Sequence, residues 1–144
     1  MKSVDMMSSP ADLAASTSEF SAFHSLEGNL RKGLLILVDH ASVALPPEYG
    51  TLGLDEAQFS RHIAYDIGIE GVARGLNKEL DVPVVMSQFS RLLIDPNRGV
   101  GDPTLVMQIS DGAVIPANAN VTTQEVAYRV EQFHQPYHQA ISAN

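Results

Sequence analysis

Gly33-Leu-Leu-Ile-Leu-Val-Asp39-His40 is the stretch of sequence that decides the fold. An apolar run between a glycine and a polar pair is typical of a strand buried on both faces, as in parallel sheets. The next residues include Pro46-Pro47, which cannot continue a ladder of backbone hydrogen bonds, so they predict a loop. Ligands of such sheets bind at the carboxyl ends of strands, so Asp39 and His40 lie where a site is expected.

The rest of the chain predicts a sheet with two helices. In chain order the pattern indicates a short edge piece (20–29), the first strand (33–39), a loop (40–50), a long amphipathic helix (55–80), a second strand (82–86), a third extended run (90–94), an irregular stretch (99–121) and a second helix (122–141). Asp111-Gly112 indicates a turn, Thr122 or Thr123 an N-cap, and Pro136 a kink. This order predicts an α/β sandwich with at least one right-handed crossover.

Length, charge and residue usage exclude several classes of protein. The 144 residues suit one domain, and 44% of them are hydrophobic, enough to build a core. A net charge of −8 argues against binding to nucleic acid or to anionic membranes. With no cysteine, any metal must be held by His, Asp or Glu.

We expect no targeting or membrane signal in the N-terminal residues. Residues 1–19 are rich in Ser and Ala and predict a flexible lead, and residues 20–144 predict the domain. No apolar run approaches the ~18 residues of a membrane span, and the lead does not resemble a secretory signal. We therefore expect a soluble cytoplasmic protein.

Histidines near the predicted strand end could carry chemistry. His40 could bind zinc or act as a general base, or it could only bond to loop backbone; its position alone gives roughly even odds. His62 and Asp66 are four residues apart, and on a helix both would point to the apolar face, where ionisable groups need a partner or a metal. The alternative, slightly favoured by spacing, is a His–Asp hydrogen bond that merely satisfies both groups.

Arg91, Asp95, Asn97 and Arg98 form a polar patch around the third extended run. The planar fork of an arginine binds a carboxylate through two hydrogen bonds, and an asparagine adds a directed amide. The alternative, which the patch alone favours, is a solvated surface turn.

His134 and His138 are also four residues apart in the second predicted helix. They lack the intervening Glu of an HExxH metal motif, and Pro136 lies between them. We interpret them as partly exposed surface histidines.

Five segments occur together in one order: DHASVALP (39–46), RHIAYDIG (61–68), SRLLIDPNR (90–98), SDGAVIPANA (110–119) and PYHQAI (136–141). In this order they resemble the N-terminal half of the N-formylglutamate amidohydrolase family, from about Phe20 to Ile141. That family is similar to zinc-dependent exopeptidases and aspartoacylase-type deacylases. The resemblance therefore implies an α/β fold, part of a phosphorylase/hydrolase-like three-layer sandwich with a mixed sheet.

The resemblance also implies an activity and its residues. It implies metal-dependent hydrolysis of N-formyl-L-glutamate, or a related N-acyl amino acid, to the amino acid and formate, in histidine degradation. Zinc is the implied cofactor, and a small N-acyl amino acid is the implied partner. The implied ligands are His40 and Asp66, with His62 supporting Asp66 or contacting substrate. The implied substrate-binding group is Arg91, Asn97 and Arg98, with Asp95 orienting the arginines.

The chain also departs from the family pattern. Family members are much longer, and a further histidine ligand and the general base are expected beyond this chain. Val43 stands where the zinc exopeptidase H-x-x-E motif has its Glu. The alternative function is a truncated, non-catalytic carboxylate-binding or regulatory module, or a scaffold for interactions. A sheet without its later strands would expose an apolar edge, which predicts a homo-oligomer.

Overall fold

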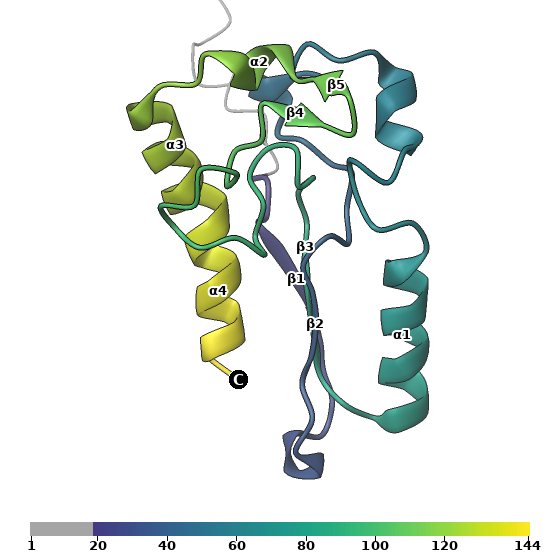
Figure 1. Ribbon diagram of the computed structural model, residues 1–144. Coiled ribbons are helices and arrows are strands. Elements are labelled where there is room, and N and C mark those ends of the chain that lie inside the picture. Colours follow the sequence, from purple (N-terminus) through teal and green to yellow (C-terminus); the bar gives the residue numbers. More distant parts are fainter. Residues whose placement is uncertain (1–18) are drawn as a thin grey trace, which may run out of the picture.

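A mixed three-stranded sheet lies at the centre of the protein, whose computed structural model describes residues 19–144 (Figure 1). The strands are β1 (Phe23–Leu26), β2 (Ile36–Val38) and β3 (Val84–Ser87). β3 is central: it pairs antiparallel with β1 and parallel with β2, and it is buried at every position. Helix α1 (Ile69–Leu80) covers one face and α4 (Gln135–Ser142) the other, so the protein has helix, sheet and helix layers.

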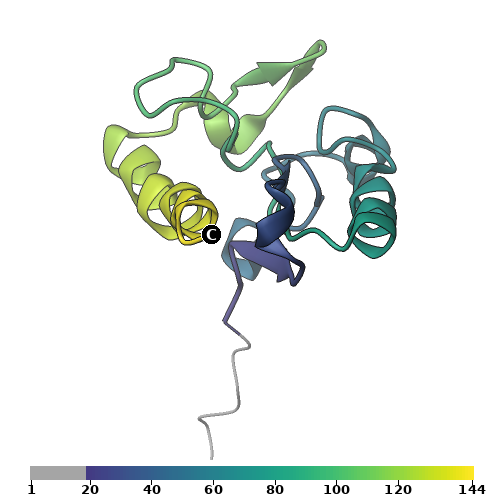
Figure 2. The same ribbon diagram turned by 90° about the horizontal axis from the view of Figure 1, so that it is seen from below.

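Short elements connect these layers. They are the 3-10 helices η2 (Leu30–Lys32), η3 (Pro47–Tyr49) and η4 (Glu56–Ser60), the hairpin of β4 (Ile109–Ser110) and β5 (Ala113–Val114), and helices α2 (Pro116–Ala119) and α3 (Thr123–Arg129). A π-helical turn, η5 (Val130–His134), joins α3 directly to α4. Figure 2 shows α1 and α4 on opposite sides of the strands.

Two apolar clusters form the core. The larger cluster contains Phe89, Leu92, Phe133 and Tyr137, and it lies under the α3–α4 helix and the loops of the hairpin. The smaller cluster lies between the sheet and α1, where Ala73 is the buried residue of the helix. Burying one large apolar side chain contributes about 1.5–3 kcal/mol, so the larger cluster supplies most of the stability.

The mixed α/β architecture confirms the predicted fold class, with β1, β2, β3 and the second helix close to their predicted positions. One detail is wrong: the first strand is not buried on both faces, because Leu37 is 46% exposed. Among the described residues β2 is an edge strand of this sheet, with β3 as its single neighbour. Within residues 19–144, no helix is both long and apolar enough to cross a membrane. The predicted flexible lead lies outside the described residues, apart from Glu19.

The long predicted helix is wrong in its first half. Asp55 caps the 3-10 helix η4, with Oδ1 accepting from the Ala57 N–H. Gly68 then adopts a φ of +83°, a left-handed conformation that ends any helix arriving from before it. α1 therefore begins only at Ile69, and His62 and Asp66 do not share a helix face.

The third extended run is buried but is not a strand. Asn118 Nδ2 donates to the Leu92 carbonyl at 2.8 Å, and Arg129 Nη1 donates to the Leu93 carbonyl at 2.9 Å. Side chains thus satisfy the backbone groups that a neighbouring strand would otherwise bond. An apolar run predicted the burial correctly and the conformation wrongly.

The C-terminal third follows its local signals. Asp111 and Gly112 both have positive φ in the turn of the β4–β5 hairpin, which confirms the predicted turn. Thr122 is the N-cap of α3, with Oγ1 accepting from the Glu125 N–H. The sequence predicted a kink at Pro136. The structure has a π-helical turn, η5, that ends at His134, two residues before this proline, which has no N–H to continue the α-helical ladder.

Gly28 gives a test of this packing. A Cβ at Gly28 would lie 2.2 Å from the Val82 carbonyl carbon and 2.4 Å from Pro83 N. We expect Gly28→Ala to lower the free energy of unfolding by about 2 kcal/mol, as overpacking does. Gly71 in α1 faces open space, so Gly71→Ala should raise the free energy of unfolding by about 0.5–1 kcal/mol. Urea denaturation of both variants checks this, and equal effects would contradict the close approach.

Candidate active site

His40 and Asp95 form the centre of a polar site at the carboxyl ends of β2 and β3. His40 follows β2, and its Nε2 donates to Asp95 Oδ1 at 2.7 Å. His40 is 7% exposed and Asp95 is fully buried. Because a carboxylate accepts but does not donate, this bond places the ring proton of His40 on Nε2.

Asp95 is surrounded by hydrogen-bond donors and positive charge. Its Oδ1 also accepts from the Asn97 backbone N–H at 2.9 Å, and its Oδ2 lies 3.1 Å from Arg91 Nη2 and 4.0 Å from Arg98 Nε. Burial by itself would raise the pKa of Asp95, but the hydrogen bonds from His40 and Asn97 and the charge of Arg91 hold it below its usual value. Asp95 is therefore ionised at neutral pH.

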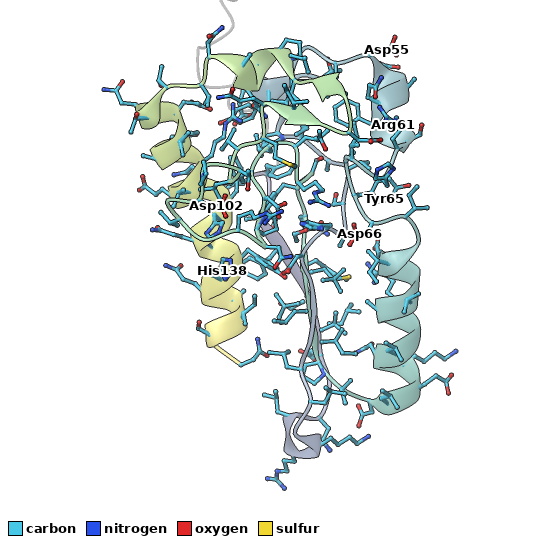
Figure 3. All side chains as sticks on the ribbon, in the orientation of Figure 1. Asp55, Arg61, Tyr65, Asp66, Asp102 and His138 are labelled. Carbon is cyan, nitrogen blue, oxygen red and sulfur yellow. The ribbon has the colours of Figure 1, made fainter. Side chains whose placement is uncertain are left out.

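The second nitrogen of His40 faces Asp66. Nδ1 lies 3.5 Å from Asp66 Oδ2, and the Asp66 backbone N–H donates to the His40 carbonyl at 2.9 Å. In Figure 3 Asp66 lies at the end of the sheet, near the start of α1. With the proton on Nε2, the lone pair of Nδ1 faces a carboxylate oxygen. Two such electron donors are stabilised by a cation between them, either an added proton or a metal ion.

The geometry of this pair fits a metal ion. Two ligand atoms of one tetrahedral zinc ion lie roughly 3.3 Å apart, close to the 3.5 Å between Nδ1 of His40 and Oδ2 of Asp66. A carboxylate on the far nitrogen of a ligating histidine, as Asp95 is here, fixes the ring in metal sites. Within residues 19–144 no three His, Asp or Glu side chains gather as a complete metal site. The described part of the chain thus offers two candidate zinc ligands, whereas catalytic zinc sites use three protein ligands.

Two further side chains fix the backbone on both sides of His40. Tyr137 OH donates to Asp39 Oδ1 at 2.7 Å, and burial, together with this contact, raises the pKa of Tyr137 well above its usual value. Ser87 Oγ donates to the Asp39 carbonyl at 2.7 Å and accepts from the Ala41 N–H. Tyr137 is fully buried in α4, so the core itself holds the start of this loop.

A pocket lies beside the site, on the α4 side of β2. It has a volume of about 380 Å³ and is lined by Leu37, Asp39, Asn97, Arg98, His134 and His138. This size suits a small ligand. The side chains of Asn97 and Arg98 are exposed, whereas Arg91 is 22% exposed and is bonded to Asp95. Arg91 Nε is buried and has no hydrogen-bond partner among the described residues.

The structure brings together most of the residues that the sequence singled out: His40, Asp66, Arg91, Asp95, Asn97 and Arg98. His62 lies apart from them. Its side chain is 70% exposed, and Nε2 lies 3.6 Å from Asp111 Oδ2, on the hairpin turn that also pairs with Arg61. The reason is the late start of α1, which removes the helical spacing from His62 to Asp66.

The sequence reasoning missed the role of α4. His134 is 7% exposed, so its interpretation as a surface residue is wrong; its Nε2 donates to the Arg98 carbonyl at 2.8 Å. His138 is exposed, as predicted, but its Nε2 donates to the Pro96 carbonyl at 2.9 Å. The four-residue spacing marked them as one face, but nothing in the pattern indicates which carbonyls they meet.

Comparisons with known proteins agree with this fold. The family model for N-formylglutamate amidohydrolase matches residues 32–144. A gene product from Agrobacterium tumefaciens superimposes with a TM-score of 0.80 and 32% identity, covering 89% of this chain and 51% of that chain. An N-formylglutamate amidohydrolase from Ralstonia eutropha JMP134 superimposes with a TM-score of 0.64 and 19% identity, covering 84% and 49%. The chain thus spans about half the length of these two solved structures, and no curated protein sequence matches it.

Asp95→Asn tests the buried pair. We expect it to lower the free energy of unfolding at pH 7 by about 3 kcal/mol, because it leaves His40 and Arg91 without their anionic partner. Asp95 has a lowered pKa when folded, so its contribution is complete above the unfolded-state pKa of roughly 3.9 and is lost as the pH falls through the folded-state value. Urea denaturation at pH 7 and pH 3 measures both effects.

The matched control is Asp81→Asn. Asp81 is an exposed C-cap in a left-handed conformation that asparagine tolerates, and it pairs with Lys32 at the surface. The result would contradict this role of the buried pair if both substitutions lowered the free energy of unfolding equally. It would also do so if the loss caused by Asp95→Asn were as large at pH 3 as at pH 7.

Proposed function

The chain belongs to the N-formylglutamate amidohydrolase family, and we propose that its site hydrolyses the amide bond of N-formyl-L-glutamate or a related N-acyl amino acid, giving the amino acid and formate or, for another acyl group, the corresponding carboxylic acid. The supporting observation is the arrangement around His40: Nε2 bonded to buried Asp95, Nδ1 facing Asp66, and two arginines close by. We also propose that the helix, sheet and helix layers are part of a zinc-exopeptidase-like sandwich. A place in histidine degradation, in the cytoplasm, stays a prediction.

In this proposal His40 Nδ1 and Asp66 hold one zinc ion. The chemistry that zinc supplies in such a site is polarisation of the scissile carbonyl and activation of a water molecule. Asp95 keeps the proton of His40 on Nε2 and fixes the ring, so Nδ1 presents its lone pair towards Asp66. We place the third ligand and the general base in the part of the fold that the two solved structures have beyond the matched half.

Asn97 and Arg98 bind the substrate carboxylates in this proposal. Both side chains are exposed, they line the pocket of about 380 Å³, and a guanidinium binds a carboxylate through paired hydrogen bonds. Arg91, which is 22% exposed, adds a second positive charge. Asp95 orients both arginines through Oδ2. Holding the carboxylates fixes the formyl amide relative to the metal ligands.

The second candidate function is a non-catalytic carboxylate-binding module. It is favoured by one observation, that the described residues supply two metal ligands rather than three. It keeps Asn97 and Arg98 as an anion site and assigns no role to a metal. Metal content separates this function from the hydrolase.

Zinc content after removal of loosely bound metal is the decisive measurement. We expect about one zinc per chain, reduced to background in His40→Ala, because that substitution removes one of two described ligands. His62→Ala is the matched control, since His62 is exposed and pairs with the hairpin turn. Absence of zinc in the unsubstituted chain, with N-formylglutamate still bound, would favour the binding module.

Arg98→Met tests the carboxylate site. We expect the KM for N-formylglutamate, followed by formate release, to rise about tenfold with little change in kcat, since a ground-state contact is lost. Arg74→Met, which breaks only a surface pair with Glu70 on α1, should leave both constants unchanged. If turnover is absent, calorimetric binding of N-formylglutamate gives the same comparison. Equal behaviour of the two variants would remove Arg98 from the site.

A further inference from the structure

Two histidines of the α3–α4 helix form hydrogen bonds to the loop that carries Asn97. The Nε2 of His138 donates to the Pro96 carbonyl at 2.9 Å, and the Nε2 of His134 donates to the Arg98 carbonyl at 2.8 Å. The two carbonyls flank Asn97 in the chain. On its inner side the same loop is held by Asp95, which accepts the Asn97 N–H with Oδ1 and the Arg98 N–H with its carbonyl.

We propose that His134 and His138 are positioning residues, which hold the backbone of residues 96–98 so that the side chains of Asn97 and Arg98 can bind a carboxylate. Neither histidine needs to touch the substrate. The identity of the ligand in this inference rests on the proposed function. The geometry rests only on the two hydrogen bonds.

The chemistry of the two rings supports this role. A backbone carbonyl accepts but cannot donate, so each ring must carry a proton on Nε2. The rings lie against each other, with centroids 4.4 Å apart and planes tilted by 36°, so each limits the rotation of the other. Burial lowers the pKa of His134, which keeps this ring neutral beside its neighbour.

The position of these rings depends on the helix geometry. His134, Tyr137 and His138 lie three and four residues apart, so they share one face of the helix. Tyr137 on this face bonds Asp39, the residue before His40. One helix face therefore contacts both loops of the site. The π-helical turn η5 ends at His134 and sets the register of this face, and such turns occur frequently at functional sites.

The exposed side chains explain why such support matters. Arg98 is 45% exposed and lies 4.0 Å from its carboxylate neighbour Asp95, so its own contacts fix it weakly. A binding group gains from a backbone that is already held, because less freedom is lost when the ligand arrives. The hydrogen bonds from His134 and His138 to the Arg98 and Pro96 carbonyls provide this support in addition to the bonds of Asp95.

The experiment compares leucine and glutamine at positions 134 and 138. Leucine removes the donor, whereas the amide nitrogen of glutamine can donate from nearly the same place as Nε2. We expect His134→Leu and His138→Leu to raise the KM for N-formylglutamate, or its dissociation constant where turnover is absent, roughly tenfold. Zinc content and kcat should change little. His134→Gln and His138→Gln should restore most of the affinity, and Gln139→Leu, an exposed neighbour on α4, should behave as the unsubstituted chain.

Two measurements test the proposal without any activity. Long-range ¹H–¹⁵N spectra should show the Nε2-protonated neutral form for both histidines at pH 7.5. Hydrogen exchange at the Asn97 and Arg98 amides should quicken in the leucine variants and return towards normal in the glutamine variants.

The outcomes separate the two claims. If the unsubstituted chain neither binds nor hydrolyses N-formylglutamate while the spectra and exchange behave as expected, the proposed function fails and the loop-holding geometry stands. If the rings are protonated on Nδ1 instead, or if leucine at both positions leaves amide exchange and affinity unchanged, the positioning role is overturned. Loss of affinity that glutamine does not restore also overturns it.

Discussion

One buried carboxylate, that of Asp95, dictates the arrangement of the whole site. An ionised carboxylate without solvent costs several kcal/mol unless charges and donors surround it. Here the surrounding groups come from two parts of the chain: His40 lies after β2, whereas Arg91 and the backbone N–H of Asn97 lie four residues before and two residues after Asp95. Satisfying Asp95 therefore fixes the His40 ring, the Arg91 guanidinium and the loop at Asn97 together.

The apolar pattern predicted burial and conformation with unequal success. Residues 82–86 are all buried, and β3 begins at Val84. Residues 34–38 are also apolar and contain β2, yet Val38 is the one buried residue of this run. Leu92, Leu93 and Ile94 are also apolar and fully buried, yet they form no strand; Asn118 and Arg129 bond the carbonyls of Leu92 and Leu93 instead. Hydrophobic pattern reports contact with the core and carries no information on which groups satisfy the backbone.

A similar limit separates the site residues from their supports. His40, Asp95 and Arg98 carry chemistry in their side chains, so residue type and motif order indicated them. His134 and His138 donate to backbone carbonyls that lie 36 and 42 residues earlier in the chain, respectively. Every residue has a backbone carbonyl, so residue types cannot indicate which carbonyl a histidine will bond. His62 and Asp66 show the opposite error: their spacing indicated a pair, but that inference needed a helix, and Gly68 delays the helix until Ile69.

The sheet and the proposed zinc site are open on the same side. Within residues 19–144, β2 is an edge strand, and its Leu37 is half-exposed. His40 lies two residues after the end of β2 and faces Asp66. A catalytic zinc site with His40 and Asp66 as ligands would need one more protein ligand. A strand added parallel to β2 would bond its free backbone groups and cover Leu37. It would also bring the residues at its own carboxyl end beside His40, because parallel strands end at the same edge of a sheet. One neighbouring strand would therefore bond the free backbone groups of β2 and also bring further side chains beside His40 and Asp66 in the proposed zinc site.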